Sequence, residues 1–113
     1  MHELTIIENI LQIAVQTADE GNLSHIRKIN VVIGKMHQVV PDILRSGFMI
    51  ASEGTKSENA VLEIETVPVR IKCKLCDAEY EVTDLFFLCL QCGSHDIKMT
   101  SGKELYVNFI EGE

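Results

Sequence analysis

Apolar residues near the amino terminus recur at intervals of three and four positions, which is the spacing of one helix face. They are Leu4, Ile7, Leu11, Ala14, Val15 and Ala18, and Ile6, Ile10 and Ile13 widen the same stripe. Thr5 and Glu8 fit an S/T-x-x-E capping box ahead of this run, and Gly21 is a natural stop. We therefore expect a well-buried helix between these two signals.

Further along the chain, apolar and polar residues alternate in three stretches, which is the pattern of half-buried strands. These stretches are residues 25–33, 61–67 and 105–110. Between the first two, Pro41 suits the first position of a second helix that ends near Gly54. The apolar positions of this helix are Ile43, Leu44, Gly47, Phe48, Ile50 and Ala51.

The four cysteines of the chain form two CxxC motifs, Cys73 with Cys76 and Cys89 with Cys92, with twelve residues between the motifs. Two such turns facing each other supply the four thiolates that tetrahedral zinc takes at about 2.3 Å. A full set of protein ligands leaves no open coordination position, so the spacing predicts a structural zinc site and not a catalytic one. No nucleophile–base pair is evident either, and we expect no enzyme activity.

Other uses of the cysteines fit the sequence less well. The chain opens without the basic and apolar regions of a secretory signal, so we expect free thiols in a reducing cytoplasm and not disulfides. A thioredoxin-like redox site needs only one CxxC motif. Rubredoxin-like iron sites are the main rival, but they carry Gly after each motif and Pro in the second. Here Asp77 and Leu90 stand at two of those positions, which favours zinc.

Together these patterns predict an α+β fold, with two helices on a small mixed β-sheet and an inserted small β domain that resembles a zinc ribbon. The cysteine module lies between the second and third predicted strands, so the first domain is discontinuous. We expect one domain over residues 1–68 and 101–113 and a zinc-binding domain over 69–100.

The charge balance argues against nucleic acid as a partner. Ten basic residues face seventeen acidic ones, and adding four thiolates and one Zn²⁺ to the formal charge of -7 brings the protein to about -9. The local basic cluster of Arg70, Lys72 and Lys74 flanks the first CxxC motif, where it can offset thiolate charge. No apolar run approaches the roughly 20 residues of a membrane span.

The amino terminus has the residues of a second metal site. Initiator methionine is normally removed only before small residues, so we expect Met1 to remain and to keep His2 at the second position. The terminal amine, the next amide nitrogen and the His2 ring can close adjacent chelate rings, and the Glu3 amide can complete four nitrogens in a plane. Planar nitrogen coordination suits Ni(II) or Cu(II). The alternative is a frayed terminus without a metal.

Over its full length the sequence resembles the HypA/HybF family of nickel metallochaperones, which take part in hydrogenase maturation. The resemblance is carried by the opening Met1-His2-Glu3-Leu4-Thr5-Ile6, by Gly54-Thr ahead of Leu62-Glu-Ile-Glu, by the two CxxC motifs and by Ser101-Gly-Lys-Glu-Leu-Tyr-Val107. It implies that His2, with the backbone nitrogens of Met1 and Glu3, binds Ni(II) as transient cargo. It also implies that Cys73, Cys76, Cys89 and Cys92 hold structural Zn(II).

The resemblance further implies delivery of nickel, together with a HypB-type GTPase, to the large subunit of [NiFe]-hydrogenase. Urease maturation proteins are further candidate partners, and the chain could also form a homodimer. Some relatives carry a histidine just after each CxxC motif, whereas this chain has only His95. The main alternative function is a zinc-ribbon interaction module without a nickel role.

Overall fold

The computed structural model describes residues 3–82 and 87–113 of the chain. Its elements are α1 (Glu3–Glu20), β1 (Ile26–Gly34), the 3-10 helix η1 (Lys35–His37), α2 (Pro41–Ala51), β2 (Val61–Val67), β3 (Val69–Cys73), β4 (Glu79–Val82), β5 (Ile97–Ser101) and β6 (Leu105–Gly112). They form two compact units, the first from residues 1–32, 39–65 and 105–113 and the second from 33–38 and 66–104. The domain boundaries expected from the sequence stay a prediction.

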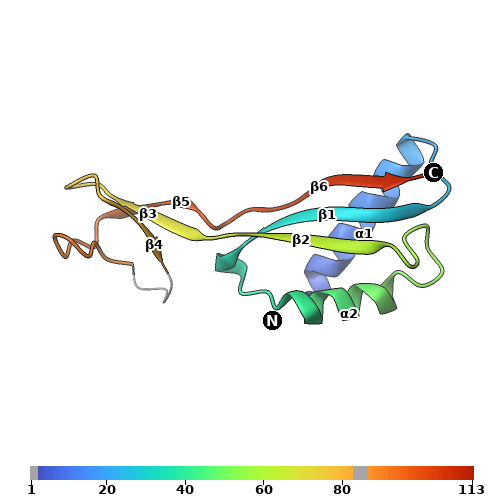
Figure 1. Ribbon diagram of the computed structural model, residues 1–113, viewed down its shortest axis with the longest axis horizontal. Coiled ribbons are helices and arrows are strands. Elements are labelled where there is room, and N and C mark those ends of the chain that lie inside the picture. Colours follow the sequence, from blue (N-terminus) through green and yellow to red (C-terminus); the bar gives the residue numbers. More distant parts are fainter. Residues whose placement is uncertain (1–2, 83–86) are drawn as a thin grey trace. The chain divides into compact units, whose positions relative to one another are not determined.

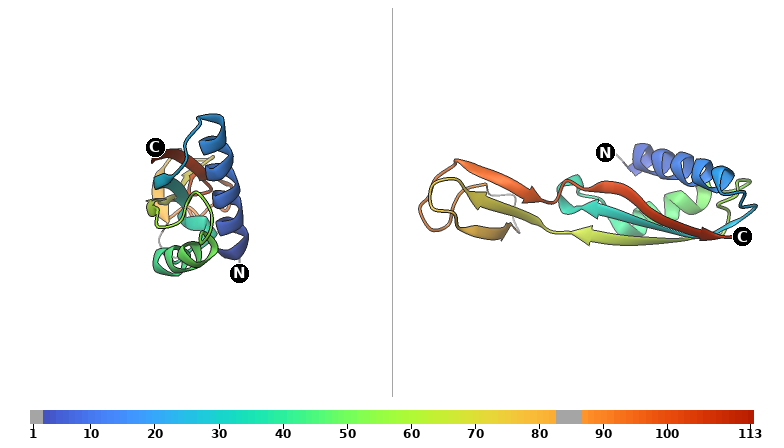
Figure 2. Two further views of the ribbon diagram at one scale, coloured as in Figure 1. Left: turned by 90° about the vertical axis from the view of Figure 1, so that its right-hand side faces the viewer. Right: turned by 90° about the horizontal axis from the view of Figure 1, so that it is seen from above.

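A three-stranded sheet in the order β2-β1-β6 organises the first unit (Figure 1). β6 runs antiparallel to β1, since His25 and Glu113 exchange two backbone hydrogen bonds at 3.0 and 2.9 Å. β2 follows the direction of β1, to which α2 connects it. Both helices cover the same face of this sheet (Figure 2). The predicted fold class, two helices on a small mixed sheet, is confirmed.

The core of the first unit is built from one stripe of α1 and from both faces of β1. The buried α1 residues are Ile6, Ile7, Ile10, Ala14 and Ala18. The predicted face of β1 is buried at Ile29, Val31 and Ile33, of which Ile33 already belongs to the second unit, and the other face is buried at Ile26, Asn30 and Val32. The predicted stripe is wrong at Leu4, which is 60% exposed, and its widening holds at Ile6 and Ile10 but is wrong at Ile13, which is 45% exposed. Leu4 precedes the first buried residue, and Ile13 instead lines a shallow groove beside Leu105 and Tyr106. The capping box is also wrong, because α1 already contains Thr5.

Helix α2 buries a narrower stripe than its apolar pattern predicts. Only Leu44 and Phe48 are buried, whereas Ile43 and Ile50 are 54% and 71% exposed. A Cβ atom at Gly47 would lie 2.6 Å from Cδ1 of Ile7, so this glycine lets α2 approach α1 closely. Because the two helices lie close together there, only two large side chains of α2, Leu44 and Phe48, enter the core.

The second unit contains the sheet β4-β3-β5, in which β3 pairs antiparallel with both neighbours. Val69, Ile71 and Cys73 are buried on one face of β3. On its exposed face Arg70 and Lys72 stand opposite two carboxylates of β4, Glu81 and Glu79. Each of these two cations therefore has an acidic cross-strand neighbour, an arrangement that favours strand pairing.

Two glycines of the second unit meet backbone to backbone, and we expect Gly34→Ala to destabilise that unit by about 1–3 kcal/mol. A Cβ at Gly34 would lie 1.9 Å from the carbonyl oxygen of Gly102, which cannot move aside as a side chain can. Gly21→Ala is the control, because the nearest atom to its Cβ would be 3.5 Å away. Chemical denaturation of the zinc-loaded variants measures their free energies of unfolding. Equal values for Gly34→Ala and Gly21→Ala would contradict the prediction.

Candidate metal centre

The second unit brings the four cysteines together. Their Sγ atoms all lie within 4.8 Å of one another, with Cys73 to Cys92 at 3.6 Å and Cys76 to Cys89 at 3.5 Å. Cys73 ends β3, and β4 and β5 flank that strand on either side. Cys73 and Cys89 are buried, at 1% and 0% exposure, whereas Cys76 and Cys92 are exposed. No other group of this kind occurs among residues 3–82 and 87–113.

The separations between the sulfur atoms fit a tetrahedral zinc ion. Zinc–sulfur bonds of about 2.3 Å place the sulfur atoms of a tetrahedron about 3.8 Å apart, close to the two observed distances. A disulfide needs sulfurs at about 2.05 Å, and all four cysteines are free. The donor set therefore fits zinc, which would be held by four thiolates with no position left for a substrate. An ion held in this way supplies folding free energy and not a reaction step.

The two CxxC motifs fold into the same backbone turn. The residue after each motif, Asp77 or Gly93, donates its N–H to the carbonyl of Cys73 or Cys89, at 3.0 and 2.8 Å respectively. Both residues adopt the left-handed backbone conformation, with φ of 61° at Asp77 and 74° at Gly93. Glycine adopts this region without strain, and Asp is among the few other residues that visit it regularly. A motif followed by Asp therefore forms the same turn as one followed by Gly.

Backbone N–H groups of these turns point at the sulfur atoms. The Cys92 N–H donates to Sγ of Cys89 at 3.4 Å, and this bond is the largest influence that lowers the pKa of the Cys89 thiol, to about 6. The Ala78 N–H lowers the pKa of the Cys76 thiol, but the Cys89 side chain and burial outweigh it and raise that pKa to about 12. Without metal, the Cys89 thiol therefore loses its proton more readily than the Cys76 thiol.

One contact to the cluster was not predicted from the sequence. The Tyr80 hydroxyl lies 3.8 Å from Sγ of Cys89. The signal that could have found it is its position in a strand just after the first CxxC motif, since strand pairing turns alternate side chains toward the cluster. Near the cluster, Lys74 pairs with Asp96 at 3.6 Å.

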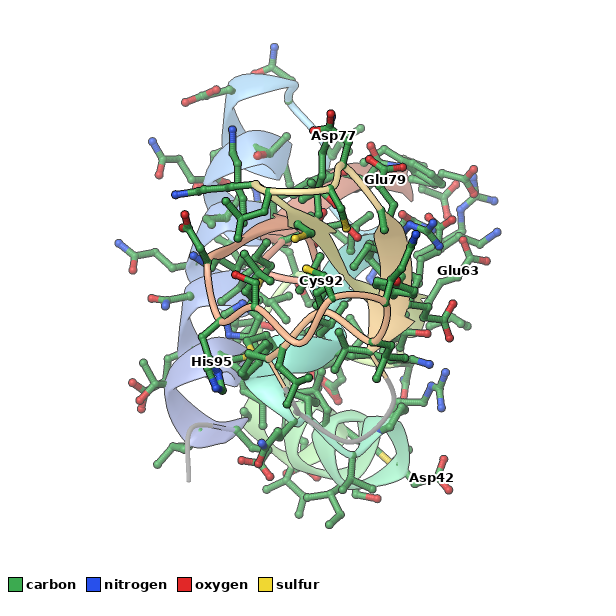
Figure 3. All side chains as sticks on the ribbon, turned by 90° about the vertical axis from the view of Figure 1, so that its left-hand side faces the viewer. Asp42, Glu63, Asp77, Glu79, Cys92 and His95 are labelled. Carbon is green, nitrogen blue, oxygen red and sulfur yellow. The ribbon has the colours of Figure 1, made fainter. Side chains whose placement is uncertain are left out.

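Two histidines of the second unit, His95 and His37, are not part of the sulfur cluster. His95 is exposed and its side chain points away from the sulfur atoms near Cys92 (Figure 3). His37 belongs to η1 in the second unit, where its Nε2 lies 3.0 Å from the Lys103 carbonyl oxygen. A carbonyl only accepts, so Nε2 carries the proton in this bond.

The predicted nickel ligands reach the described part of the chain only at Glu3. This residue is partly buried and begins α1. Met1 and His2 lie outside the described residues. In the part of the chain that the structure covers, no helix is long and apolar enough to cross a membrane.

Comparison with known proteins relates this arrangement to one family. A family model described as hydrogenase/urease nickel incorporation, metallochaperone, hypA matches residues 1–112. The chain belongs to the HypA family. The hydrogenase maturation factor HypA of Moorella thermoacetica is 40% identical over 113 residues, which cover 100% of both chains. That of Roseiflexus sp. is 35% identical over 114 residues, covering 100% of this chain and 93% of the other. HypA proteins are nickel metallochaperones of hydrogenase maturation.

Two solved HypA structures share the fold. The solution structure of the Ni metallochaperone HypA from Helicobacter pylori matches with a TM-score of 0.68 at 23% identity, covering 99% of this chain and 97% of that chain. A second solution structure of a HypA protein matches with a TM-score of 0.72 at 23% identity, over 100% and 97% of the two chains. The combination of two helices, small sheets and a four-cysteine cluster is thus the HypA fold.

Proposed function

We propose that this chain binds Ni(II) at its amino terminus and helps to insert it into [NiFe]-hydrogenase. The ligands would be the Met1 amine, the His2 amide and ring nitrogens and the Glu3 amide nitrogen. The observation that carries the proposal is the full-length match to a nickel metallochaperone family by a chain that begins Met1-His2-Glu3. The two catalytic alternatives, an open metal site and a nucleophile–base pair, have no residues to support them in the sequence.

The start of α1 is compatible with such a chelate. The first four N–H groups of an α-helix make no i→i−4 bond, so metal binding at the Glu3 nitrogen takes no such bond from α1. The terminal amine and the His2 ring are the protonatable ligands of this set. A chelate of this kind can release its ion stepwise as those groups take up protons or are exchanged, which suits transient cargo.

The proposal assigns the other metal a structural role. Cys73, Cys76, Cys89 and Cys92 would hold Zn(II), in a zinc-binding domain over residues 69–100 that is separate from a nickel-binding domain over 1–68 and 101–113. The four thiolates would retain zinc, and the nitrogen ligands at the amino terminus would remain free to bind Ni(II). The partners would be a HypB-type GTPase and the hydrogenase large subunit, with urease maturation proteins and a second copy of this chain as further candidates.

Nickel titration of the untagged, zinc-loaded protein tests the proposal. We expect one Ni(II) per chain, and a loss of affinity of more than about 100-fold in His2→Ala, because a ligand counts for more than the outer residues that orient it. His25→Ala is the matched control, since His25 lies just before β1 and an alanine there keeps the backbone hydrogen bonds to Glu113.

A second arm of the same experiment tests the free amine. Two residues added before Met1 displace the amine from the His2 chelate, so nickel binding should fall as it does in His2→Ala. Unchanged nickel affinity in both the His2→Ala and the extended protein would overturn the proposal. It would leave the chain as a zinc-ribbon interaction module.

A further inference from the structure

Tyr80 connects the two halves of the cysteine cluster. It lies in β4, directly opposite Ile71 of β3, and its side chain is half-buried. From this strand, which follows the first CxxC motif, its hydroxyl reaches Sγ of Cys89 in the second motif at 3.8 Å. The contact thus spans the module independently of any ion.

We propose that Tyr80 is a positioning residue of the metal centre, whose hydroxyl donates to the Cys89 sulfur and sets how firmly the site keeps its ion. The inference rests on the zinc site proposed above and goes beyond it, because it assigns the retention of zinc to a side chain that is not a ligand. The nickel site plays no part in it.

The hydrogen bond from Tyr80 matters because Cys89 is buried. Cys89 is 0% exposed, so water does not solvate the charge that its sulfur keeps when bound to zinc. A buried charged group is costly unless hydrogen-bond donors surround it. The Cys92 N–H supplies one donor from a turn, at 3.4 Å, and the Tyr80 hydroxyl supplies another from β4. A tyrosine hydroxyl ordinarily titrates near pH 10, so it carries its proton at neutral pH and can donate it.

The same contact orients the sulfur before an ion arrives. Residues that hold a ligand in place from outside the coordination sphere typically change metal affinity by about 10- to 100-fold when mutated. Because the Cys92 N–H remains as a second donor, we expect Tyr80 to account for the lower end of this range.

Zinc release from the full-length, zinc-loaded chain tests the proposal. In Tyr80→Phe the ring stays and only the hydroxyl is lost, so transfer of zinc to a colorimetric chelator at neutral pH should become about tenfold faster. Tyr106→Phe is the matched control, because it removes the chain's other tyrosine hydroxyl from β6. We expect Tyr106→Phe to release zinc at the rate of the parent.

Tyr80→Leu separates the hydroxyl from ring packing. If both Tyr80→Phe and Tyr80→Leu release zinc faster than the parent, and at about the same rate as each other, the hydroxyl carries the effect. If Tyr80→Phe behaves as the parent and only Tyr80→Leu is faster, the ring acts by packing alone and the proposal is overturned. Cobalt-loaded protein gives a second signal, since loss of a donor to sulfur should shift the sulfur-to-cobalt charge-transfer band in Tyr80→Phe. An unshifted band counts against the proposal.

The outcomes also distinguish this inference from the zinc site on which it rests. A parent chain that holds no zinc at all would end both. A parent and a Tyr80→Phe variant that hold zinc equally firmly would end only the role of Tyr80.

Discussion

Replacing Cys89 with serine should remove the zinc ion and unfold the β4-β3-β5 sheet. Cys89 is a fully buried member of the cluster, and binding of structural zinc supplies about 10–16 kcal/mol in zinc-finger peptides at neutral pH. The sheet has three short strands and few buried apolar side chains, so it cannot replace that free energy. We expect less than one zinc per chain by elemental analysis and rapid hydrogen exchange at the amides of β3.

Leu90→Ala is the control for this experiment. Leu90 lies inside the same CxxC motif but is 75% exposed, so its removal should leave both zinc content and exchange protection unchanged. Treating the parent protein with a strong chelator should reproduce the Cys89→Ser result. A Cys89→Ser protein that keeps a full zinc ion and slow exchange in β3 would show that the cluster does not stabilise this sheet.

Phe48→Ala should destabilise the first unit by about 3–5 kcal/mol. Phe48 is 1% exposed and belongs to the narrow buried stripe of α2, so its removal leaves a cavity that the helix pair cannot easily close. Chemical denaturation of the zinc-loaded protein, followed by far-ultraviolet circular dichroism, measures this loss because both α-helices lie in the first unit.

The neighbouring residue provides the matched control for Phe48. Met49 is also a large apolar residue of α2 but is 67% exposed, so Met49→Ala should change the free energy of unfolding by no more than about 0.5 kcal/mol. Equal effects of the two substitutions would contradict the placement of the buried stripe on α2.

The sequence predicted the bounds of helices and strands well where these bounds depend on neighbouring residues. The strand expected over residues 61–67 is observed as Val61–Val67, and α2 begins at Pro41 as expected. A proline fixes its own φ and suits the first helical turn, and strand alternation is read from adjacent residues. The capping box at Thr5 failed because its residues also fit inside a helix, and the sequence alone does not exclude that reading.

Burial could not be read from the sequence with the same success. Leu4, Ile13, Ile43 and Ile50 all fit the apolar periods, yet each is exposed in the folded protein. Whether an apolar residue is buried depends on what lies opposite it, and a single helix sequence does not contain that information. Close approach of α2 to α1 at Gly47 leaves only one stripe of α2 in the core.

For the metal centre, the cysteine spacing by itself determined the donor type and the number of ligands, because thiolate chemistry and a two-residue turn are local properties. Asp77 and Leu90, beside and within the CxxC motifs, gave the preference for zinc over iron. Only the tertiary structure decided that Cys73 and Cys89 are buried while Cys76 and Cys92 are exposed, and that Tyr80 reaches the second motif. These features depend on strand pairing between residues far apart in the chain. Sequence periodicity specifies which face a side chain takes on its own strand, but not which atom of another segment meets it there.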